Sequence, residues 1–367
     1  MNIKGKPYRT IWVAADGWSV EIIDQTKLPH ELAIASLKTA DDAARAIKTM
    51  QVRGAPLIGA MAAYGVCLAL RADASDEAVG RAIAMLAEQR PTGINLRWGL
   101  EEMRNAIHMI PREKRAAAAY ERAAELCDDD VKVNTRIGQH GLKPILVAAE
   151  EKAQGEAVNI LTHCNAGWLA GVDRGTGLAP VYEAHDRGIK VHVWVDETRP
   201  RNQGASLTAY ELGAQGVPHT IIVYNAGGHL MQQGMVDLVL VGADRVTTNG
   251  DAANKIGTYL KALAAKNNGV PFYVAMPHST IDWTLASGTE IPIEERGAEE
   301  VLVMSGRTKD GKIVPVEIAA PGSPARNDAF DVTPARLITG LITERGVAAA
   351  SREGLLALYP ERAGEAQ

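Results

Sequence analysis

Short apolar runs alternate with amphipathic stretches over the second half of the chain, and this pattern constrains the fold more than any other feature. Five runs rich in β-branched residues end at Cys164, Glu197, Asn225, Asp244 and Pro277. Between them lie stretches with a helical pattern, at 179–187, 206–215, 227–234 and 253–266. Apolar strands separated by helices of about ten residues form βαβ units, which build a parallel sheet covered on both faces. We therefore predict a Rossmann-like parallel-sheet domain over residues 151–367.

The first half of the chain has a different pattern. Residues 10–25 contain two apolar runs around Asp16-Gly17, a strong turn pair, and predict a short antiparallel hairpin. Residues 31–150 are rich in alanine and other good helix formers, with a break at 91–93 and a looser pattern at 138–144. The expected class is α/β, with a mainly helical domain at 1–150. A length of 367 residues suits two domains of about 150 residues or more.

The composition argues against several classes of partner. The net charge of −5 offers no basic field for nucleic acid or an anionic membrane, and aromatic residues make up only 5% of the chain. No run reaches the roughly 18 apolar residues of a membrane span, and the N-terminus lacks the apolar core of a signal peptide. We expect no nucleic acid, no membrane and a cytoplasmic location, with the polar C-terminal residues 358–367 frayed.

The three cysteines, Cys67, Cys127 and Cys164, lie far apart and form no CxxC pair. This spacing predicts neither a metal site nor a disulfide framework, and it suits a reducing compartment. Cys164 differs from the others because it ends a predicted strand and precedes a turn in a glycine-rich loop. Such a loop brings backbone N–H groups close to a ligand. The alternative is that Cys164 is a small buried hydrophobic residue like the other two.

Ligands of an open α/β sheet bind outside the carboxyl ends of its strands. The polar residues at these ends are His163, Cys164, Asn165, Asp196, Glu197, Asn225, Asp244 and Arg245. No GxGxxG or GxxxxGK[ST] motif is present, so neither a dinucleotide nor a P-loop nucleotide site is indicated.

Asp244 either caps the following Asn249-Gly250 turn or presents a carboxyl group to a pocket. In the second interpretation, Asn254 and Lys255 return to the same pocket near the start of a helix. There the lysine offers a point charge to phosphate. In the first half, Arg53 precedes a helix that begins near Pro56, and Arg90 lies at a break between helices. Each arginine alone could be a solvated surface residue, whereas a pair at a cleft would clamp phosphate or carboxylate.

These segments together resemble the methylthioribose-1-phosphate isomerase family, whose superfamily also contains regulatory subunits of a eukaryotic translation-initiation exchange factor. The resemblance runs nearly end to end and rests on motifs in the same order: DGWSVEIIDQTKLP, QVRGAPLIGAMAAYG, RPTGINLRW, LTHCNAGWLA, DETRPRNQGASLTAYEL, VGADRVTTNGDAANKIGTY, PFYVAMPHSTID, IPIEER and RNDAFDVTPARLITGLITERG. The chain has Gly93 and Ile94 where the family usually has alanine and valine.

The resemblance implies an aldose–ketose isomerase that converts 5-methylthioribose 1-phosphate to 5-methylthioribulose 1-phosphate in methionine salvage. It implies that Asp244 is the catalytic acid/base and that Cys164 stabilises the transition state. Substrate contacts are implied for Arg53, Gly54, Ala55, Arg90, Gln203, Asn254 and Lys255. The family is typically homodimeric and needs no metal or other cofactor.

Three alternatives stay open. 5-Deoxyribose 1-phosphate would fit a similar apolar pocket as a second substrate. A ribose-1,5-bisphosphate isomerase would need further basic residues for its second phosphate. A non-catalytic regulatory subunit would have no chemical need for both Cys164 and Asp244. For the substituent at C5, we expect an apolar pocket near Trp98, Trp168 and Leu169.

Overall fold

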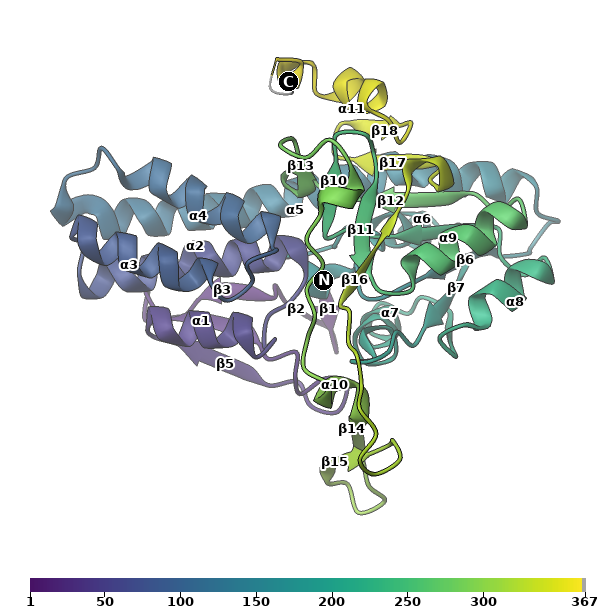
Figure 1. Ribbon diagram of the computed structural model, residues 1–367, viewed down its shortest axis with the longest axis horizontal. Helices are drawn as coiled ribbons and strands as arrows, with labels where there is room; N and C mark the ends of the chain where they lie inside the picture. Colours follow the sequence, from purple (N-terminus) through teal and green to yellow (C-terminus); the bar gives the residue numbers. More distant parts are fainter. Residues whose placement is uncertain (365–367) are drawn as a thin grey trace.

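A helical half and a sheet half lie side by side in the computed structural model, which describes residues 1–364 (Figure 1). The N-terminal half opens with a two-stranded ribbon, followed by a three-stranded antiparallel sheet in the order β3-β4-β5. These strands are β1 (Asn2–Ile3), β2 (Lys6–Pro7), β3 (Ile11–Val13), β4 (Val20–Ile23) and β5 (Ile34–Leu37).

The predicted hairpin is confirmed, because β3 pairs with β4 in antiparallel register. Asp16 closes its turn by accepting hydrogen bonds from the backbone N–H groups of Trp18 (2.9 Å) and Ser19 (2.8 Å). The helical prediction from residue 31 onward is wrong at β5. This strand pairs along β4 and buries Leu37, so tertiary pairing overrides the local preference.

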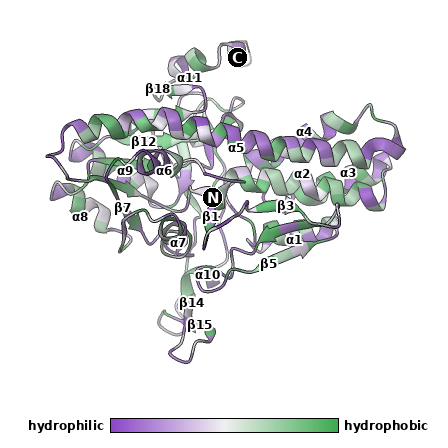
Figure 2. Ribbon diagram, turned by 180° about the vertical axis from the view of Figure 1, so that it is seen from behind, coloured by the Kyte–Doolittle hydropathy of each residue, from purple (hydrophilic) through white to green (hydrophobic). Residues whose placement is uncertain are grey.

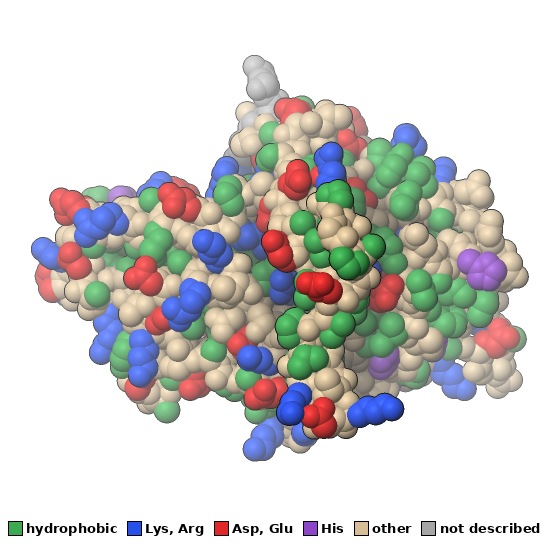
Figure 3. Space-filling model, turned by 60° about the horizontal axis from the view of Figure 1, so that its bottom comes forward, with side chains coloured by type: hydrophobic (Ala, Val, Ile, Leu, Met, Phe, Trp, Pro, Cys, Tyr) green, Lys and Arg blue, Asp and Glu red, His purple; other side chains and the backbone are tan. Residues whose placement is uncertain are grey.

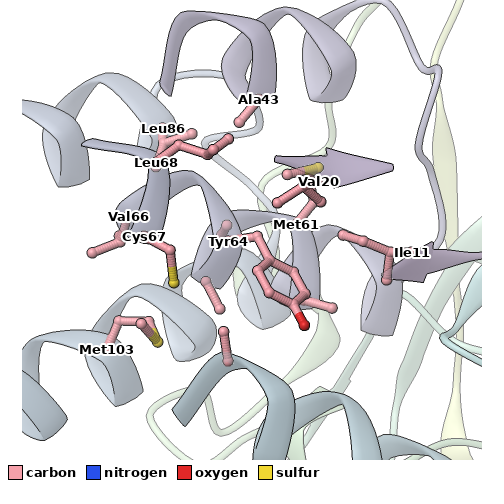
Figure 4. Close-up of a cluster of buried hydrophobic side chains, with 14 of the residues drawn as sticks. Ile11, Val20, Ala43, Met61, Tyr64, Val66, Cys67, Leu68, Leu86 and Met103 are labelled. Atoms are coloured by element: carbon pink, nitrogen blue, oxygen red, sulfur yellow. The ribbon is translucent and has the colours of Figure 1, made fainter. Parts of the chain in front are cut away.

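Four helices pack on this sheet around a hydrophobic core (Figure 4): α1 (Ala40–Lys48), α2 (Ala55–Ala72), α3 (Asp76–Ala87) and α4 (Ile94–Ile107). The expectation that no segment is long and apolar enough to span a membrane is wrong for α2, which meets that test by length and composition. However, 78% of this helix is buried inside the protein. Its apolar character is that of a core helix, with Met61, Tyr64 and Cys67 facing the other helices.

Helix α5 (Arg112–Glu150) runs without interruption through residues 138–144, so the predicted loosening there is wrong. The glycines serve packing instead. A Cβ atom on Gly141 would lie 2.3 Å from Cγ of Pro180, and its absence lets α6 (Ala179–Asp186) approach closely. Helix α5 lies along both halves of the molecule (Figure 2). The division at residue 150 stays a prediction, although β6 (Val158–Thr162) begins the large sheet shortly after it.

The second half is built on a seven-stranded sheet in the order β18-β17-β12-β9-β6-β7-β8, parallel except between β17 and β18. The Rossmann-like α/β prediction is confirmed. The five predicted runs form β6, β7 (Val191–Asp196), β8 (His219–Ile222), β9 (Leu238–Val241) and β12 (Phe272–Ala275). Two further strands were not predicted, β17 (Gly340–Thr343) and β18 (Gly346–Ala348). The helices of this half include α7 (Ala209–Ala214), α8 (Ala226–Gln232) and α9 (Thr258–Asn267).

A smaller sheet in the order β13-β10-β11-β16 lies between the two halves. Its strands are β10 (Arg245–Thr247), β11 (Ala252–Lys255), β13 (Ile281–Asp282) and β16 (Phe330–Thr333). The helix predicted over 253–266 is therefore wrong at its start, since α9 begins only at Thr258. Residues 252–255 form a strand because β10 and β16 flank them on both sides with antiparallel pairing.

An arm formed by α10 (Glu299–Leu302), β14 (Val303–Arg307) and β15 (Ile313–Glu317) projects from this region. It faces the viewer in Figure 3, where exposed hydrophobic side chains lie among charged ones. At the other end, α11 (Arg352–Leu358) precedes Tyr359, which is buried and hydrogen-bonded to Glu344 (3.0 Å). The predicted fraying of residues 358–367 is wrong at Tyr359, and residues 365–367 lie outside the described part of the chain.

Candidate active site

A cavity lies between the two halves, beside the carboxyl ends of β6 and β9. The structure brings all nine sequence-predicted site residues to its wall. They are Arg53, Gly54, Ala55, Arg90, Cys164, Gln203, Asp244, Asn254 and Lys255. They come from six separate segments of the chain, so the cavity exists only when both halves are folded together.

The first turn of α2 forms one side of the cavity. Gly54 has a φ of 91°, and a Cβ atom there would lie 2.5 Å from Cα of Ala170, so only glycine fits this approach. No side chain caps the helix, and its first residues line the cavity, so the free backbone N–H groups of this helix end suit an anion. Arg53 donates to the side-chain oxygen of Asn165 and, over 2.8 Å, to its carbonyl oxygen.

Strand β11 forms the opposite side. Lys255 lies 5.2 Å from the centre of the Phe330 ring, and its pKa falls to about 8 because burial and the nearby Arg296 charge disfavour the ammonium form. Asn254 donates a hydrogen bond to Thr258 (3.1 Å). Gln203 is buried, and its side-chain oxygen has no hydrogen-bond partner within residues 1–364. A ligand with a donor group would satisfy this oxygen.

Two charged residues at the cavity were missed by the sequence reasoning. Arg296 lines it directly, and Glu294 forms ion pairs with both Arg296 (3.0 Å) and Arg90 (3.4 Å). Burial raises the pKa of Glu294, but the two guanidinium groups outweigh burial and leave the pKa below its ordinary value. The IPIEER motif contains both residues and was a signal for them, although nothing in its pattern showed that it crosses the cleft.

The charges of this site do not cancel. Arg53, Arg90, Lys255 and Arg296 line the cavity, and Asp244 is the one acidic residue of its lining within residues 1–364. Glu294 pairs with Arg90 and Arg296 from beside the cavity, and Glu300 is paired with Arg201. The excess of two positive charges in a mostly buried space matches a phosphate group, which carries close to two negative charges at pH 7. A neutral ligand would leave these charges uncompensated.

Cys164 and Asp244 supply the groups able to react. Burial raises the pKa of the Cys164 thiol, so the neutral thiol prevails. Burial also raises the pKa of Asp244, and the charges of Arg90 and Lys255 partly oppose that rise. No hydrogen bond to the Asp244 carboxylate forms within residues 1–364, so this group is available to a ligand. A carboxyl with a raised pKa is suited to exchanging protons near neutral pH.

The remaining strand-end residues do not line the cavity, apart from Asn165. Asp196 pairs with Lys261 in the interior, and Arg245 pairs with Asp282 (3.3 Å). The carboxylate of Glu197 accepts the N–H of Tyr224 (3.0 Å). Strand position therefore identified the correct edge of the sheet, but only the ends of β6 and β9 reach the cavity.

The residues that were expected to form an apolar pocket for the C5 substituent do not line this cavity. Trp168 and Leu169 are fully buried in the core, and Trp98 packs against His278, away from this cavity. Instead, a small side chamber adjoins the cavity at Ala55, Arg90, Asp244 and Phe330. Its other apolar lining residues are Ile58, Ile94, Ala253, Ile291 and Pro292.

No group of three or more His, Cys, Asp or Glu side chains that could hold a metal ion occurs within the described residues 1–364. The donor set of the cavity is mainly basic, which suits an anion and not a cation.

Residues 51–350 match the Initiation factor 2 subunit family. A methylthioribose-1-phosphate isomerase of Paramagnetospirillum magneticum is 62% identical over 364 residues, which cover 99% of this chain and 100% of the relative. The chain belongs to the methylthioribose-1-phosphate isomerase family. The relative of the same description from Acidiphilium cryptum is also 62% identical, with 99% of each chain covered.

Two solved structures extend the family comparison. The crystal structure of 5-methylthioribose 1-phosphate isomerase from Pyrococcus horikoshii OT3 has a TM-score of 0.81 at 39% identity and covers 97% of each chain. A structure described as the delta subunit of translation initiation factor eIF-2B from A. fulgidus has a TM-score of 0.78 at 37% identity. It covers 96% of this chain and 100% of that chain. Solved structures with this fold are therefore described both as isomerases and as translation initiation factor subunits.

Proposed function

We propose that this protein interconverts 5-methylthioribose 1-phosphate and 5-methylthioribulose 1-phosphate, the aldose–ketose step of methionine salvage. The observation that carries the proposal is a buried cavity that combines an excess of two positive charges with one free carboxyl group and one neutral thiol. The names of the full-length relatives point to the same reaction.

The chemistry explains why such a cavity is needed. The phosphate blocks the C1 oxygen of the sugar, so the free aldehyde used by ordinary sugar isomerases does not form by simple ring opening. An acid must protonate the ring oxygen while its bond to C1 breaks. One hydrogen then moves from C2 to C1, and the C2 hydroxyl loses its proton as the ketone forms. The reaction is an isomerisation, so it needs no external oxidant or reductant.

Each residue takes a role that suits its chemistry. Asp244 donates the proton to the ring oxygen, because its raised pKa keeps part of the population protonated. Cys164 stabilises the transition state as a neutral thiol. Arg53, Lys255 and the first turn of α2 bind the phosphate. Gln203 and Asn254 add polar contacts, and Arg90 lies where the cavity meets the side chamber.

The side chamber favours some of the substrate alternatives over others. Asp244 lies at its junction with the cavity, so a sugar ring placed there directs its phosphate to the basic cavity and its C5 substituent into the apolar chamber. Arg245 at the chamber is already paired with Asp282, and Arg90 with Glu294. A second phosphate would lose its hydration with little counter-charge. The mainly apolar lining favours methylthio and methyl substituents, which supports 5-deoxyribose 1-phosphate as a second substrate.

Incubation of the purified enzyme with 5-methylthioribose 1-phosphate, followed by NMR, tests the proposal through the appearance of the ketone carbon. Deuterium at C2 distinguishes the two hydrogen-transfer routes. A hydride shift retains the label at C1, whereas a proton route through an enediolate exchanges it with water. A protein that binds the sugar phosphate but forms no ketose would instead support the regulatory-subunit alternative, which the eIF-2B neighbour keeps open.

We further propose a cytoplasmic homodimer that binds neither nucleic acid nor membrane. Three buried free cysteines suit a reducing compartment. The arm exposes Ile313, Val316 and Ile318, each at nearly half of its full accessibility, which is unfavourable in a monomer. Light scattering of the full chain measures the mass, and loss of dimer in Val316→Glu would place the arm in the interface.

A further inference from the structure

Two threonine hydroxyl groups hold the backbone on either side of Cys164. The N–H of Cys164 donates to the side-chain oxygen of Thr198 over 2.8 Å. On the other side, the hydroxyl of Thr208 donates to the carbonyl oxygen of Cys164 over 2.7 Å. All three residues are buried, so water does not compete for these bonds.

The backbone of Cys164 needs such support. Its φ of 63° lies in the left-handed region, which residues with a Cβ atom rarely adopt without external contacts. On either side, Asn165 is bound to Arg53 and His163 is packed in the interior, which fixes the chain before and after the cysteine. The conformation therefore depends on the hydrogen bonds of the cysteine peptide groups.

The direction of the Thr198 hydroxyl is fixed by its own partners. It donates its single hydrogen to the carbonyl oxygen of Asp196 (2.9 Å), so only a lone pair remains for the N–H of Cys164. The Asp196 carboxylate accepts the N–H of Thr198 (2.7 Å) and is held by the buried Lys261 ammonium group. The threonine is thereby fastened to a buried ion pair.

Thr208 connects the cysteine to the phosphate end of the cavity. Its oxygen accepts a hydrogen bond from the side-chain amide of Asn165 (3.2 Å), whose oxygen accepts from Arg53. Thr208 ends the π-helical turn Gly204–Thr208, which follows Gln203. A Cβ atom on Gly204 would clash with the Asp196 carbonyl, so the turn is pressed against the segment that carries Thr198. One hydrogen-bonded chain thus runs from Arg53 to Asp196.

We propose that Thr198 and Thr208 are positioning residues that hold Cys164 in its left-handed conformation, with the thiol directed into the cavity. The proposal rests on the proposed role of Cys164 in the isomerase reaction. Neither threonine lines the cavity, so neither touches substrate. Their effect is on the orientation of the thiol.

Replacement of each hydroxyl by a methyl group tests this role. Thr198→Val and Thr208→Val are expected to lower kcat about tenfold while KM stays within about twofold, because each variant removes the hydrogen bond that holds one peptide group of Cys164 in its left-handed conformation. Thr208→Ser keeps the hydroxyl and is expected to restore kcat. Thr343→Val is the matched control, because Thr343 is fully buried in β17, donates to the carbonyl of Gly346 and accepts the N–H of Arg345 (3.1 Å), and does not line the cavity.

A second measurement does not depend on catalysis. The rate at which iodoacetamide labels Cys164, followed by peptide mass spectrometry, is expected to rise at least threefold in both valine variants and to stay unchanged in Thr343→Val. Normal kcat and normal labelling in the folded valine variants would overturn the proposal, as would an equal loss of kcat in the control. If the wild type forms no ketose, the proposed function fails, and labelling alone still tests the positioning.

Discussion

Arg53 donates hydrogen bonds to both the side chain and the main chain of Asn165, and so joins the start of α2 to the loop after β6. The two residues are 112 positions apart and belong to opposite halves of the molecule. Because one guanidinium group makes both bonds, the helix N-terminus and the cysteine loop are held in a single geometry.

Arg53→Lys keeps the positive charge but cannot form the paired bonds. We expect kcat/KM for methylthioribose 1-phosphate to fall about 10- to 100-fold, the scale of a lost charge-assisted hydrogen bond of about 1.5–3 kcal/mol. Steady-state kinetics measure the change. Arg71→Lys is the control, because Arg71 stacks on Trp18 far from the cavity. Equal kcat/KM for Arg53→Lys and wild type would show that charge alone matters there.

Asp244→Asn retains the shape of the side chain and removes its exchangeable acid proton. General acid–base catalysis contributes about 10²–10⁴-fold, so we expect kcat to fall at least 100-fold. The unfolding temperature should change little, since the carboxylate makes no hydrogen bond within residues 1–364. Asp310→Asn, on the exposed arm, controls for a general effect of losing a carboxylate. Near-normal turnover in the folded variant would remove Asp244 from the mechanism.

The three cysteines are expected to separate into two classes. Cys164→Ser should lower kcat, because Cys164 alone lines the cavity. Cys67 and Cys127 lie in the N-terminal core beside Tyr64, where burial raises the pKa of both thiols. Serine at either position should lower the unfolding temperature without changing kcat of the folded fraction. Thermal melts and kinetics on the same samples test this, and similar kcat losses in all three would contradict it.

The pH dependence should report Lys255. Burial lowers its pKa to about 8, so the ammonium form is present below that pH and is lost as the pH rises through 8. We expect kcat/KM, which reports the free enzyme, to decline above about pH 8 as phosphate binding weakens. Lys255→Arg keeps its charge and should lack this decline, even if its kcat/KM is lower throughout. A profile of the same shape for both enzymes would assign the decline to another group.

Much of the fold follows from local pattern. The apolar runs that became β6, β7, β9 and β12 are mostly buried, and such strands are recognisable from sequence. Strand β8 was also predicted, although it lies at the edge of the sheet and exposes Ile221. The small sheet was missed because its strands are short and separated by more than 80 residues between β10 and β16. Strand β11 reads as the start of a helix, and only its pairing partners, distant in sequence, make it a strand.

The residues of the site were predictable and its geometry was not. Family motifs placed Arg53 and Lys255 in one cavity, yet Glu294, which pairs with Arg90, lies 204 positions from it in the sequence. Hydrophobic type alone suggested Trp98, Trp168 and Leu169 for the apolar wall. Trp168 and Leu169 are buried in the core of the sheet half, and Trp98 is partly buried against the N-terminal core. No local pattern reveals which apolar residues border a cavity.

The side chamber predicts an order of preference among three substrates. Methylthioribose 1-phosphate should have the highest kcat/KM, and 5-deoxyribose 1-phosphate should be about tenfold lower because it buries roughly two fewer methylene-sized groups at about 0.8 kcal/mol each. Ribose 1,5-bisphosphate should turn over barely, since its second phosphate would enter an apolar chamber whose arginines are already paired. Kinetics of the three substrates on one preparation measure this order.

Ile94→Lys adds a positive charge at the chamber. It tests whether the lack of a counter-charge there explains the order of preference among the three substrates. Ile94 is the first residue of α4 and is only partly buried, so the helix should tolerate the change. We expect the ratio of kcat/KM for the bisphosphate over the methylthio substrate to rise at least tenfold, because the ammonium group compensates the second phosphate. Ile293→Lys is the matched control, since Ile293 is exposed and does not line the chamber. If both variants changed the ratio equally, long-range charge would explain the effect. A preference of the wild-type enzyme for the bisphosphate would overturn the assigned substrate but leave the isomerase chemistry in place.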